Sequence, residues 1–417
     1  MCQGRSWLGE IRWLVWLLGV ITVVSARASW SQTPDEMHSL YTGGHVFALR
    51  DLVGAKPAPA LYRGAVSVSR NRIAEAENLL HGVIAAEPSS EDAYLAHDLL
   101  ANLYQRNGMY RAALGELKAE QRMRPEAKDV ASVVPLFELL GKSEDLRVLA
   151  HRHSLVPSAD RTLPVRINGK HVSYGFDTGG GLSVMSESEA RRVGLTLTKV
   201  STKMGDSSGN GVSGFNIAMA KEISIAGVRL QNVAFLVFPD TNEPFVEMPP
   251  DEVNRGLIGL PVLVAIKTLR WHPNKDVELG FVSKPSGEPQ NMLFHGSNPI
   301  VQVVSGGKVL EFSLDTGAVD TDLNPQFAKE LPKLVLSGQK ETHTITGIGG
   351  VSSNESILLD SVGFQIGGYA VKLKPAHVFV TRGLGGESPW AGNLGNDLLN
   401  QAHTVTLDFQ TMSLRLD

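Results

Sequence analysis

Apolar residues recur at helical spacing in the first third of the chain, between about residues 69 and 153. Small and apolar side chains return every three or four positions from Ala74 to Ile84, and again around Leu99–Tyr104. This periodicity predicts amphipathic helices. Pro88 ends the first run, and Gly108 separates the second run from the next apolar stretch, so we expect the helices to pack as hairpins.

From about residue 157 the pattern changes to short strand-like runs, and the same order of features occurs twice. Each copy has a strand-like run, a helix-like stretch, a glycine-rich stretch, a β pair around a glycine turn, and an apolar run containing glycine. The first copy comprises Val172–Phe176, Glu187–Val193, Gly205–Gly214, Ile223–Val237 and Leu257–Leu263; the second comprises Val309–Leu314, Pro325–Leu331, Gly347–Gly350, Val362–Val380 and Asn393–Leu399. Such a repeat is a signal about the whole fold.

Each copy carries the tripeptide Asp-Thr-Gly directly after its strand-like run, beginning at Asp177 and at Asp315. The distance from this Asp to the glycine of the last element is 82 residues in the first copy (177 to 259) and 80 in the second (315 to 395). Two facing loops of this kind can form a carboxylate dyad. Neighbouring carboxyl groups cannot both ionise, so one stays protonated and the pair can act as acid and base together.

These motifs resemble those of the aspartic proteases, and the retropepsin branch in particular. The loop from Asp315 to Thr321, the segment Ile345–Gly350 and the segment Gly395–Gln401 carry the likeness, which extends over roughly residues 161–417. The resemblance implies a two-lobed all-β pseudo-dimer within one chain, with lobes at residues 157–285 and 290–417. The predicted fold class is therefore multi-domain α + β, in which N-terminal helical hairpins are followed by this two-lobed unit.

The resemblance also assigns the site. It implies catalytic roles for Asp177 and Asp315, and it implies that Thr178 and Thr316 bond across to the opposite loop. Gly179 and Gly317 allow each loop to turn sharply. The glycine-rich stretches correspond to flaps. The flap and substrate-binding residues that we expect are Gly209, Gly211, Gly347, Ile348, Gly349 and Trp390, although Trp390 could equally serve ordinary loop packing.

Neither Gly180 nor Ala318 offers a hydroxyl to the outer carboxylate oxygens. The missing donor leaves the ionised form less stabilised and raises the pKa values of the dyad. We therefore expect a less acidic pH optimum than that of pepsin-like enzymes, whose loops carry Ser at this position. A rate profile that peaks below about pH 3 would contradict this, because ordinary carboxyl groups already titrate near 4.

Within residues 69–153, the stretch from about Tyr94 to Ala127 resembles one tetratricopeptide unit. Small, aromatic and turn residues fall at the expected places, namely Ala101, Tyr104, Gly108, Ala113 and Pro125. The number of repeats is too small for a free-standing solenoid. The helical region could be a platform for a protein partner or substrate, a pro-segment, or a plain packing domain.

Residues 1–28 have the features of a secretory signal peptide. Arg5 and Arg12 precede the apolar run Trp13–Val24, and Ala26-Arg27-Ala28 matches a cleavage site. We therefore expect export to a bacterial periplasm or secretion, with an uncleaved anchor as the alternative interpretation of this segment and residues 29–68 as an irregular linker. No stable membrane span is expected after cleavage. The only cysteine is Cys2, so the mature chain would contain no disulfide.

Other motifs and the charge balance narrow the function. The net charge of −4 gives no indication of nucleic-acid binding. The stretch Gly205–Gly209 matches the nucleophile motif Gly-x-Ser-x-Gly, but the residues after it cannot form the helix that this motif needs. His151 and His153 do not have the spacing of a helical metal pair. We therefore expect no metal and no cofactor.

The sequence thus favours an aspartic endopeptidase that acts on a peptide or protein substrate. Two alternatives remain: a catalytically inactive protein of the same fold that binds peptides, and an adaptor in which the tetratricopeptide-like region carries the function.

Overall fold

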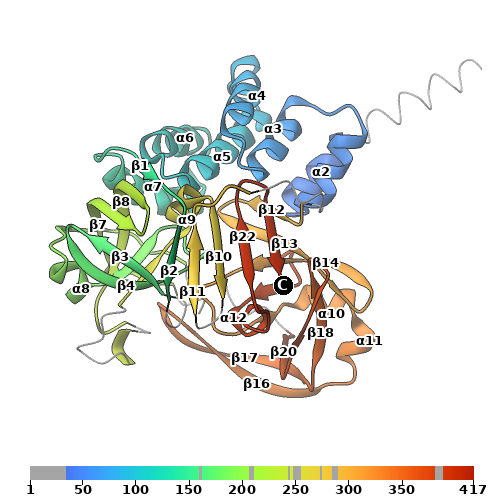
Figure 1. The fold of residues 1–417 in the computed structure, drawn as a ribbon. Helices are drawn as coiled ribbons and strands as arrows, with labels where there is room; N and C mark the ends of the chain where they lie inside the picture. The colour runs from blue at the N-terminus through green and yellow to red at the C-terminus, as the bar shows by residue number, and fades with distance from the viewer. Residues whose placement is uncertain are drawn as a thin grey trace, which may run out of the picture.

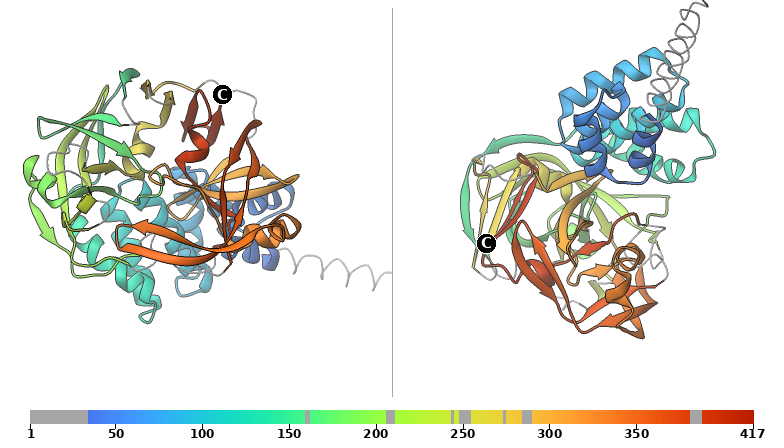
Figure 2. Two further views of the ribbon diagram at one scale, coloured as in Figure 1. Left: turned by 90° about the horizontal axis from the view of Figure 1, so that it is seen from below. Right: turned by 90° about the vertical axis from the view of Figure 1, so that its right-hand side faces the viewer.

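The computed structural model describes residues 34–158, 162–205, 211–242, 245–247, 255–272, 275–283, 290–380 and 388–417. Helices from the first third of the chain lie together along one side of a larger β region (Figures 1 and 2). The predicted signal peptide at residues 1–28 lies outside the described residues. Among the helices of the described residues, none is long and apolar enough to cross a membrane.

The helical region begins earlier and ends earlier than predicted. Residues 34–42 are helical, and helices α2 and α3 follow, so much of residues 29–68 is ordered helix, not the irregular linker that we expected. The strand β1 (Arg147–His151) lies within the predicted helical range 69–153 but pairs with a distant strand. The helices are α2 (Val46–Ala55), α3 (Ala60–Ser69), α4 (Ile73–Ala86), α5 (Glu91–Arg106), α6 (Tyr110–Met123) and α7 (Lys128–Leu140).

Small residues and caps explain how these helices form and pack. The side chain of Ser90 accepts a hydrogen bond from the backbone of Ala93 and so caps the N-terminus of α5. A Cβ atom at Gly64 would lie only 2.5 Å from Leu80, so the glycine allows α3 and α4 to approach closely. Ala76 and Leu80 are fully buried on the facing side of α4.

The first β region is an eight-stranded sheet in the order β1-β8-β5-β9-β4-β3-β7-β6. In it, β4 runs parallel to β9 with Gly175 opposite Leu257. The bounds are β3 (Leu163–Ile167), β4 (Lys170–Phe176), β5 (Ser183–Ser186), α8 (Glu187–Arg192), β6 (Leu197–Lys199), β7 (Asn216–Ile225), β8 (Val228–Phe238), the 3-10 helix η1 (Phe245–Glu247), β9 (Gly256–Ile258) and α9 (Leu260–Ile266).

The second β region forms a ten-stranded sheet in which β14 runs parallel to β21, with Ser313 opposite Asn393. This pairing occupies the same place in the second copy as the pairing of β4 with β9 in the first. The bounds are β12 (Met292–His295), β13 (Asn298–Ser305), β14 (Lys308–Leu314), β15 (Asp322–Leu323), α10 (Pro325–Glu330), α11 (Pro332–Val335), β16 (Gln339–Gly347), β17 (Gly350–Leu359), β18 (Val362–Ile366), β19 (Tyr369–Leu373), β20 (Ala376–Phe379), β21 (Gly392–Leu394) and α12 (Asn396–Leu399).

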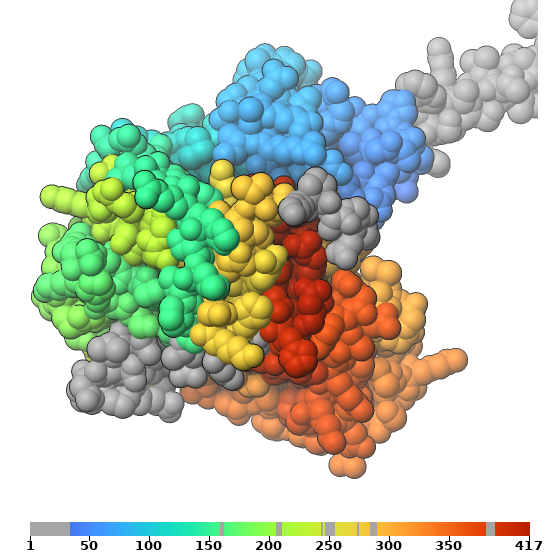
Figure 3. All heavy atoms as spheres, viewed as in Figure 1, coloured from blue at the N-terminus to red at the C-terminus, as the bar shows by residue number. Residues whose placement is uncertain are grey.

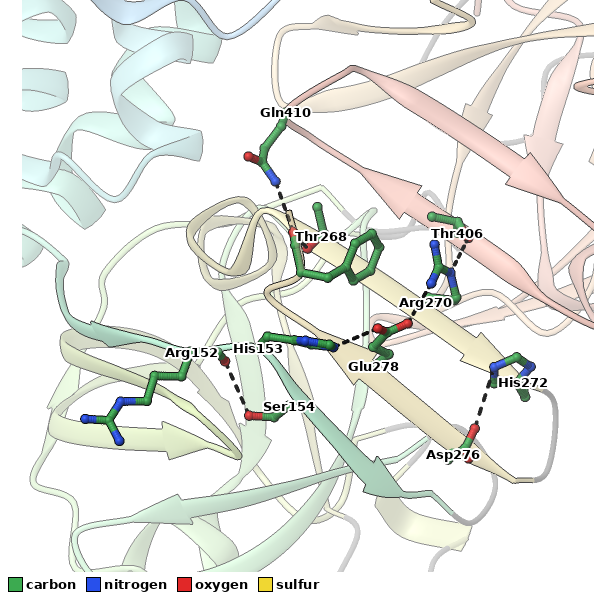
Figure 4. A network of polar contacts seen from close by, with 11 residues as sticks. Arg152, His153, Ser154, Thr268, Arg270, His272, Asp276, Glu278, Thr406 and Gln410 are labelled. Atoms are coloured by element: carbon green, nitrogen blue, oxygen red, sulfur yellow. Dashed lines mark hydrogen bonds and ion pairs between the residues drawn. The ribbon is translucent and has the colours of Figure 1, made fainter. Parts of the chain in front are cut away.

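A third sheet joins the two β regions. Its five strands are β2 (Ser154–Pro157), β11 (Asp276–Leu279), β10 (Thr268–His272), β22 (Val405–Asp408) and β23 (Ser413–Leu416), in that order. Figure 4 shows how Arg270 of β10 reaches both neighbouring strands: it donates to Glu278 at 2.7 Å and to Thr406 at 3.2 Å. Strands from the two copies of the repeat therefore hydrogen-bond directly, through β10 and β22.

Two large apolar cores hold the molecule together. One is shared by the two β regions and includes Trp271, Phe294 and Phe312. The other joins the helical region to the first β region: Tyr110 and Phe137 from the helices pack in the same cluster as Phe215 and Phe238. The space-filling view shows the helices in continuous contact with the β region beneath them (Figure 3).

Arg106, at the end of α5, ties the helical region to the second β region as well. It is fully buried, its Nη1 donates to the carbonyl of Gly296 at 2.8 Å, and its guanidinium lies 4.6 Å from the ring centroid of Phe294. The same group bonds within the helical region, to Asn71 and to the carbonyl of Val68. One buried side chain therefore links the two parts.

Candidate active site

The two Asp-Thr-Gly loops begin where parallel strands end side by side. The backbone N–H of Asp177 donates to the carbonyl of Ile258 in β9 at 2.8 Å, and that of Asp315 donates to the carbonyl of Leu394 in β21 at 3.0 Å. Asp177 thus directly follows β4, and Asp315 directly follows β14. In both cases a hydrogen bond to the neighbouring parallel strand fixes the position where the loop begins.

Backbone N–H groups orient both carboxylates in the same way. Oδ1 of Asp177 accepts hydrogen bonds from Gly179 at 2.8 Å and from Gly180 at 2.9 Å. Oδ1 of Asp315 accepts from Gly317 at 2.9 Å and from Ala318 at 3.1 Å. Two backbone donors hold one oxygen of each group, and this fixes the orientation of the carboxylate.

The two threonines exchange hydrogen bonds between the loops, as the resemblance implied. Oγ1 of Thr178 donates to the carbonyl of Leu314 at 2.7 Å and accepts from the backbone N–H of Thr316 at 3.1 Å. Oγ1 of Thr316 donates to the carbonyl of Phe176 at 2.9 Å and accepts from the backbone N–H of Thr178 at 3.1 Å. Both threonines are buried, so these reciprocal bonds set the loops in a fixed relation.

The loop glycines are required by the opposite carboxylate. A Cβ atom at Gly179 would lie 2.8 Å from the carboxyl carbon of Asp315, and one at Gly317 would lie 2.6 Å from that of Asp177. Only a residue without a side chain leaves room for the two acids to meet. The sequence suggested glycine for a sharp turn, and the structure gives this close approach as the stronger reason.

The two carboxyl groups lie within hydrogen-bonding range of each other, and this changes their chemistry. Burial raises the pKa of Asp177 to about 8, with further contributions from the charge of Asp315 and from a hydrogen bond with it. As whole residues both aspartates are of intermediate exposure, whereas the threonines beneath them are buried. The pair can therefore hold one proton between them and still reach solvent.

A further pair of hydroxyl residues connects each aspartate loop to the glycine of the last element in its copy. Ser183 and Thr321, each six residues after the aspartate, accept hydrogen bonds from the backbone of Gly259 at 3.0 Å and of Gly395 at 2.8 Å, respectively. Thr321 also donates to Asp397 at 2.5 Å. The first copy has Pro261 at the place of Asp397. Ser183 therefore has no carboxylate partner at that position, whereas Thr321 has one.

Asn393 contacts the dyad, and the sequence pattern did not single it out. Its Nδ2 donates to the second oxygen of Asp315, Oδ2, at 3.2 Å. Its Oδ1 accepts a hydrogen bond from Ser313 at 2.7 Å. Aligning the two copies places Asn393 where the first copy has Leu257, but only the register of the strands shows that it faces Asp315.

The predicted flap residues fall partly inside the described part of the chain. Strands β16 and β17 form a long hairpin whose tip holds Gly347, Ile348 and Gly349, and the carbonyl of Ile348 accepts from Asn242 of the first β region at 3.1 Å. In the first copy, Met204 and Val212 form an isolated bridge, and Gly211 has a φ of 68°. Gly209 lies outside the described residues.

The contacts of Trp390 favour the packing alternative over a role in substrate binding. Its Nε1 donates to the carbonyl of Gly44 at 3.4 Å, and its ring meets that of His295 edge to face at 5.7 Å. Trp390 also packs against a small apolar cluster that includes Phe47 of α2. The tryptophan therefore anchors the start of the helical region on the second β region.

Glu341, His343 and His377 form a group whose potential ligand atoms all lie within 4.8 Å of one another, although the sequence indicated no metal constellation. The rings of His343 and His377 stack at 3.9 Å and are inclined by 20°. Nitrogen lone pairs lie in the ring plane, so two stacked rings cannot both direct them at one ion. Nδ1 of His377 instead pairs with Glu341.

Comparison with known protein families gives a match for the part of the chain that contains Asp177. Residues 163–262 match the model of a family described as aspartyl protease. A search of curated proteins found no match to the chain. The matched segment runs from β3 into α9 and contains Asp177, and it supports an aspartyl protease domain in this part of the protein.

Proposed function

We propose that the protein is an aspartic endopeptidase in which Asp177 and Asp315 activate a water molecule for attack on a peptide bond. The observation that carries the proposal is the contact between these two carboxyl groups, each delivered by the same strand-loop arrangement. The two β regions would be the lobes of a single-chain pseudo-dimer, covering residues 157–285 and 290–417. We refer to them below as the first and second lobes.

The mechanism follows from a dyad that holds one proton. The ionised aspartate accepts a proton from the water as its oxygen bonds to the peptide carbonyl carbon, and the protonated aspartate donates to the carbonyl oxygen. No covalent intermediate with the protein forms. Thr178 and Thr316 keep the two groups in register, and Gly179 and Gly317 leave room for them. The hairpin with Gly347, Ile348 and Gly349, and the first-lobe stretch around Gly209 and Gly211, would close over the substrate.

The tetratricopeptide-like helices would support the lobes, and they could also receive a protein partner. The signal-like features at residues 1–28 would direct the protein to a periplasm or out of the cell, where it would meet peptides or proteins as substrates. The absence of cysteine after Cys2 is compatible with a bacterial periplasm.

The test is cleavage of a diverse peptide library between pH 3 and pH 8, with and without pepstatin. We expect Asp177→Asn and Asp315→Asn each to reduce kcat by at least about 10³-fold, because either change removes the acid–base pair. Asp360→Asn, at an exposed turn, is the matched control and should cleave like the wild type. Wild-type protein that cleaves no peptide, or full activity in either dyad variant, would contradict the proposal.

The same experiment addresses the two alternatives. An inactive peptide-binding protein would retain peptides from the library without cutting them. An adaptor would do neither, and its function would follow the helical region.

A further inference from the structure

The two halves of the dyad have different surroundings at one pair of positions. In the second lobe, Ser313 and Asn393 stand opposite each other on the parallel strands β14 and β21. In the first lobe, Gly175 and Leu257 occupy the same places on β4 and β9. A Cβ atom at Gly175 would lie 2.9 Å from Cδ2 of Leu257, so the leucine fills the space that a residue-175 side chain would need.

This difference gives only one aspartate a side-chain donor from the strand beside it. Nδ2 of Asn393 donates to Oδ2 of Asp315 at 3.2 Å, and Oδ1 of the same amide accepts from the Ser313 hydroxyl at 2.7 Å. The serine thus orients the amide with its N–H toward the carboxylate. Leu257 presents only hydrocarbon at the corresponding place. A hydrogen bond to the ionised form favours that form, so Asp315 is the better site for the negative charge.

The charges around Asp315 are compatible with this division. Asp177 faces it across the dyad, and Asp322 on β15 stands directly opposite Asn393 in the sheet. Burial raises the pKa of Asp322 to about 7, with smaller contributions from Asp320, Asp397 and Asp315. Below that pH Asp322 is neutral and does not repel a charge on Asp315. Nε2 of His343 lies 3.9 Å from Oδ1 of Asp322.

We infer that the resting dyad is unequal: Asp315 carries the negative charge and is the general base, Asp177 carries the proton and is the general acid, and Ser313 with Asn393 is the positioning pair that sets this division. The inference rests on the proposed function for its catalytic meaning. In the reaction, Asp315 takes one proton from the water, the water oxygen bonds to the carbonyl carbon, and the proton of Asp177 passes to the carbonyl oxygen.

A paired exchange tests the inference without creating a steric clash. The variant Ser313→Gly/Asn393→Leu gives the second lobe the residues of the first, and Ser313→Ala removes only the hydroxyl that orients the amide. The readout is the carbon-13 signal of aspartate labelled at the side-chain carboxyl, followed from pH 3 to pH 9. Asp177→Asn and Asp315→Asn identify the two signals.

In the wild type we expect Asp315 to ionise at lower pH than Asp177. In the paired variant, the ionisation of Asp315 should move up by about one pH unit, because a donor to a charged group is lost. The acidic limb of kcat/KM should move by the same amount, with kcat reduced on the order of tenfold and KM little changed. Ser313→Ala should give a smaller shift in the same direction, and Ser313→Thr should behave like the wild type.

Two further variants separate the possible outcomes. Gly175→Ser/Leu257→Asn supplies a donor to Asp177 and should lower the pH at which that group ionises. Asp322→Asn should leave the order of ionisation unchanged. The inference is overturned if Asp177 ionises first in the wild type, or if the paired variant does not move Asp315. Because the carboxyl signals do not depend on cleavage, a protein that cuts no peptide would overturn the proposed function and still test this inference.

Discussion

At the residue scale, the raised pKa of Asp177 has a consequence for the working pH. Burial and the neighbouring Asp315 hold the pKa of this carboxyl at about 8. The proposed mechanism needs one protonated and one ionised group, so activity would persist as long as Asp177 keeps its proton. The glycine at position 180 adds to this effect, because it supplies no hydroxyl to the outer oxygen.

We therefore expect kcat/KM to be bell-shaped in pH, with an alkaline limb closer to pH 8 than to the ordinary carboxyl value near 4. The sign follows from the raised pKa: activity is lost as rising pH removes the proton from Asp177. Initial rates on one cleaved peptide from pH 3 to pH 9 would measure this. A maximum below about pH 3 would show that neither the burial nor the missing hydroxyl governs the dyad.

The sequence alone predicted those site residues that occur in both copies of the repeat. Asp177, Asp315 and their threonines stand in two matching tripeptides, so their meeting could be expected. Asn393 could not be, because its role depends on which face of β21 it occupies and on how close β14 brings Ser313. A difference between two copies gains meaning only when the register of the strands is known.

At the scale of elements, α5 is held at its end by one buried cation. Arg106 has no carboxylate partner in its described contacts; carbonyl groups, Asn71 and the face of Phe294 surround it. Burial lowers its pKa to about 9. The guanidinium fork satisfies carbonyls from two parts of the chain at once, which an ammonium group cannot reproduce.

Arg106→Ala should lower the free energy of unfolding by about 3 kcal/mol, since it leaves buried carbonyls unpaired and removes contact with Phe294. Arg106→Lys should recover only part of the loss. Urea unfolding measures both, with Arg63→Ala on the exposed face of α3 as the control. If Arg106→Ala cost no more than Arg63→Ala, the linking role of the side chain would be wrong.

The elements that the sequence misplaced share a physical reason. Helix α2 has no side-chain hydrogen bond at its N-cap, and it packs on α3 and on β12, which is more than 200 residues away. Strand β1 has a largely exposed face with no alternating pattern, and it exists because β8 pairs with it. Long-range contacts decide both, whereas the helices α4 to α7 follow their own periodicity.

At the scale of the whole molecule, the helical region is part of the same folded body as the first lobe. Its side chains share an apolar core with Leu182, Phe215 and Phe238. Deletion of residues 29–150 would expose that core, so loss of activity on deletion would not separate an adaptor from a protease. Point variants that leave the core filled are the better test.

Within the helical region, Glu120 makes stability depend on pH. It is buried in α6, its Oε1 has no hydrogen-bond partner among the described residues, and burial followed by the charges of Asp98, Asp129 and Glu116 raises its pKa to about 8 from 4.5. The folded protein thus binds this proton more tightly than the unfolded chain. The contribution to stability is complete below about pH 4.5 and is lost as the pH rises to 8.

Glu120→Gln should therefore raise the free energy of unfolding by at least about 1 kcal/mol at pH 8 and leave it little changed at pH 5. Thermal unfolding at both values measures the difference. Glu126→Gln, at an exposed position of the same region, should show no such dependence. Equal effects of the two variants at pH 8 would mean that Glu120 is solvated in the folded protein.

The described residues of the two glycine-rich stretches are attached to the rest of the protein unequally. Thr202, just before the first, donates to the carbonyl of Ser132 in α7 at 2.6 Å, and Val212 is buried in the core shared with the helices. The second, β16 with β17, alternates exposed and partly buried residues along most of its length. At its tip the carbonyl of Ile348 accepts from Asn242, and Ile348 packs against the edge of the same core. A substrate would then reach the two aspartates by displacing β16 and β17, because Thr202 and Val212 beside the first stretch stay bound to the helices.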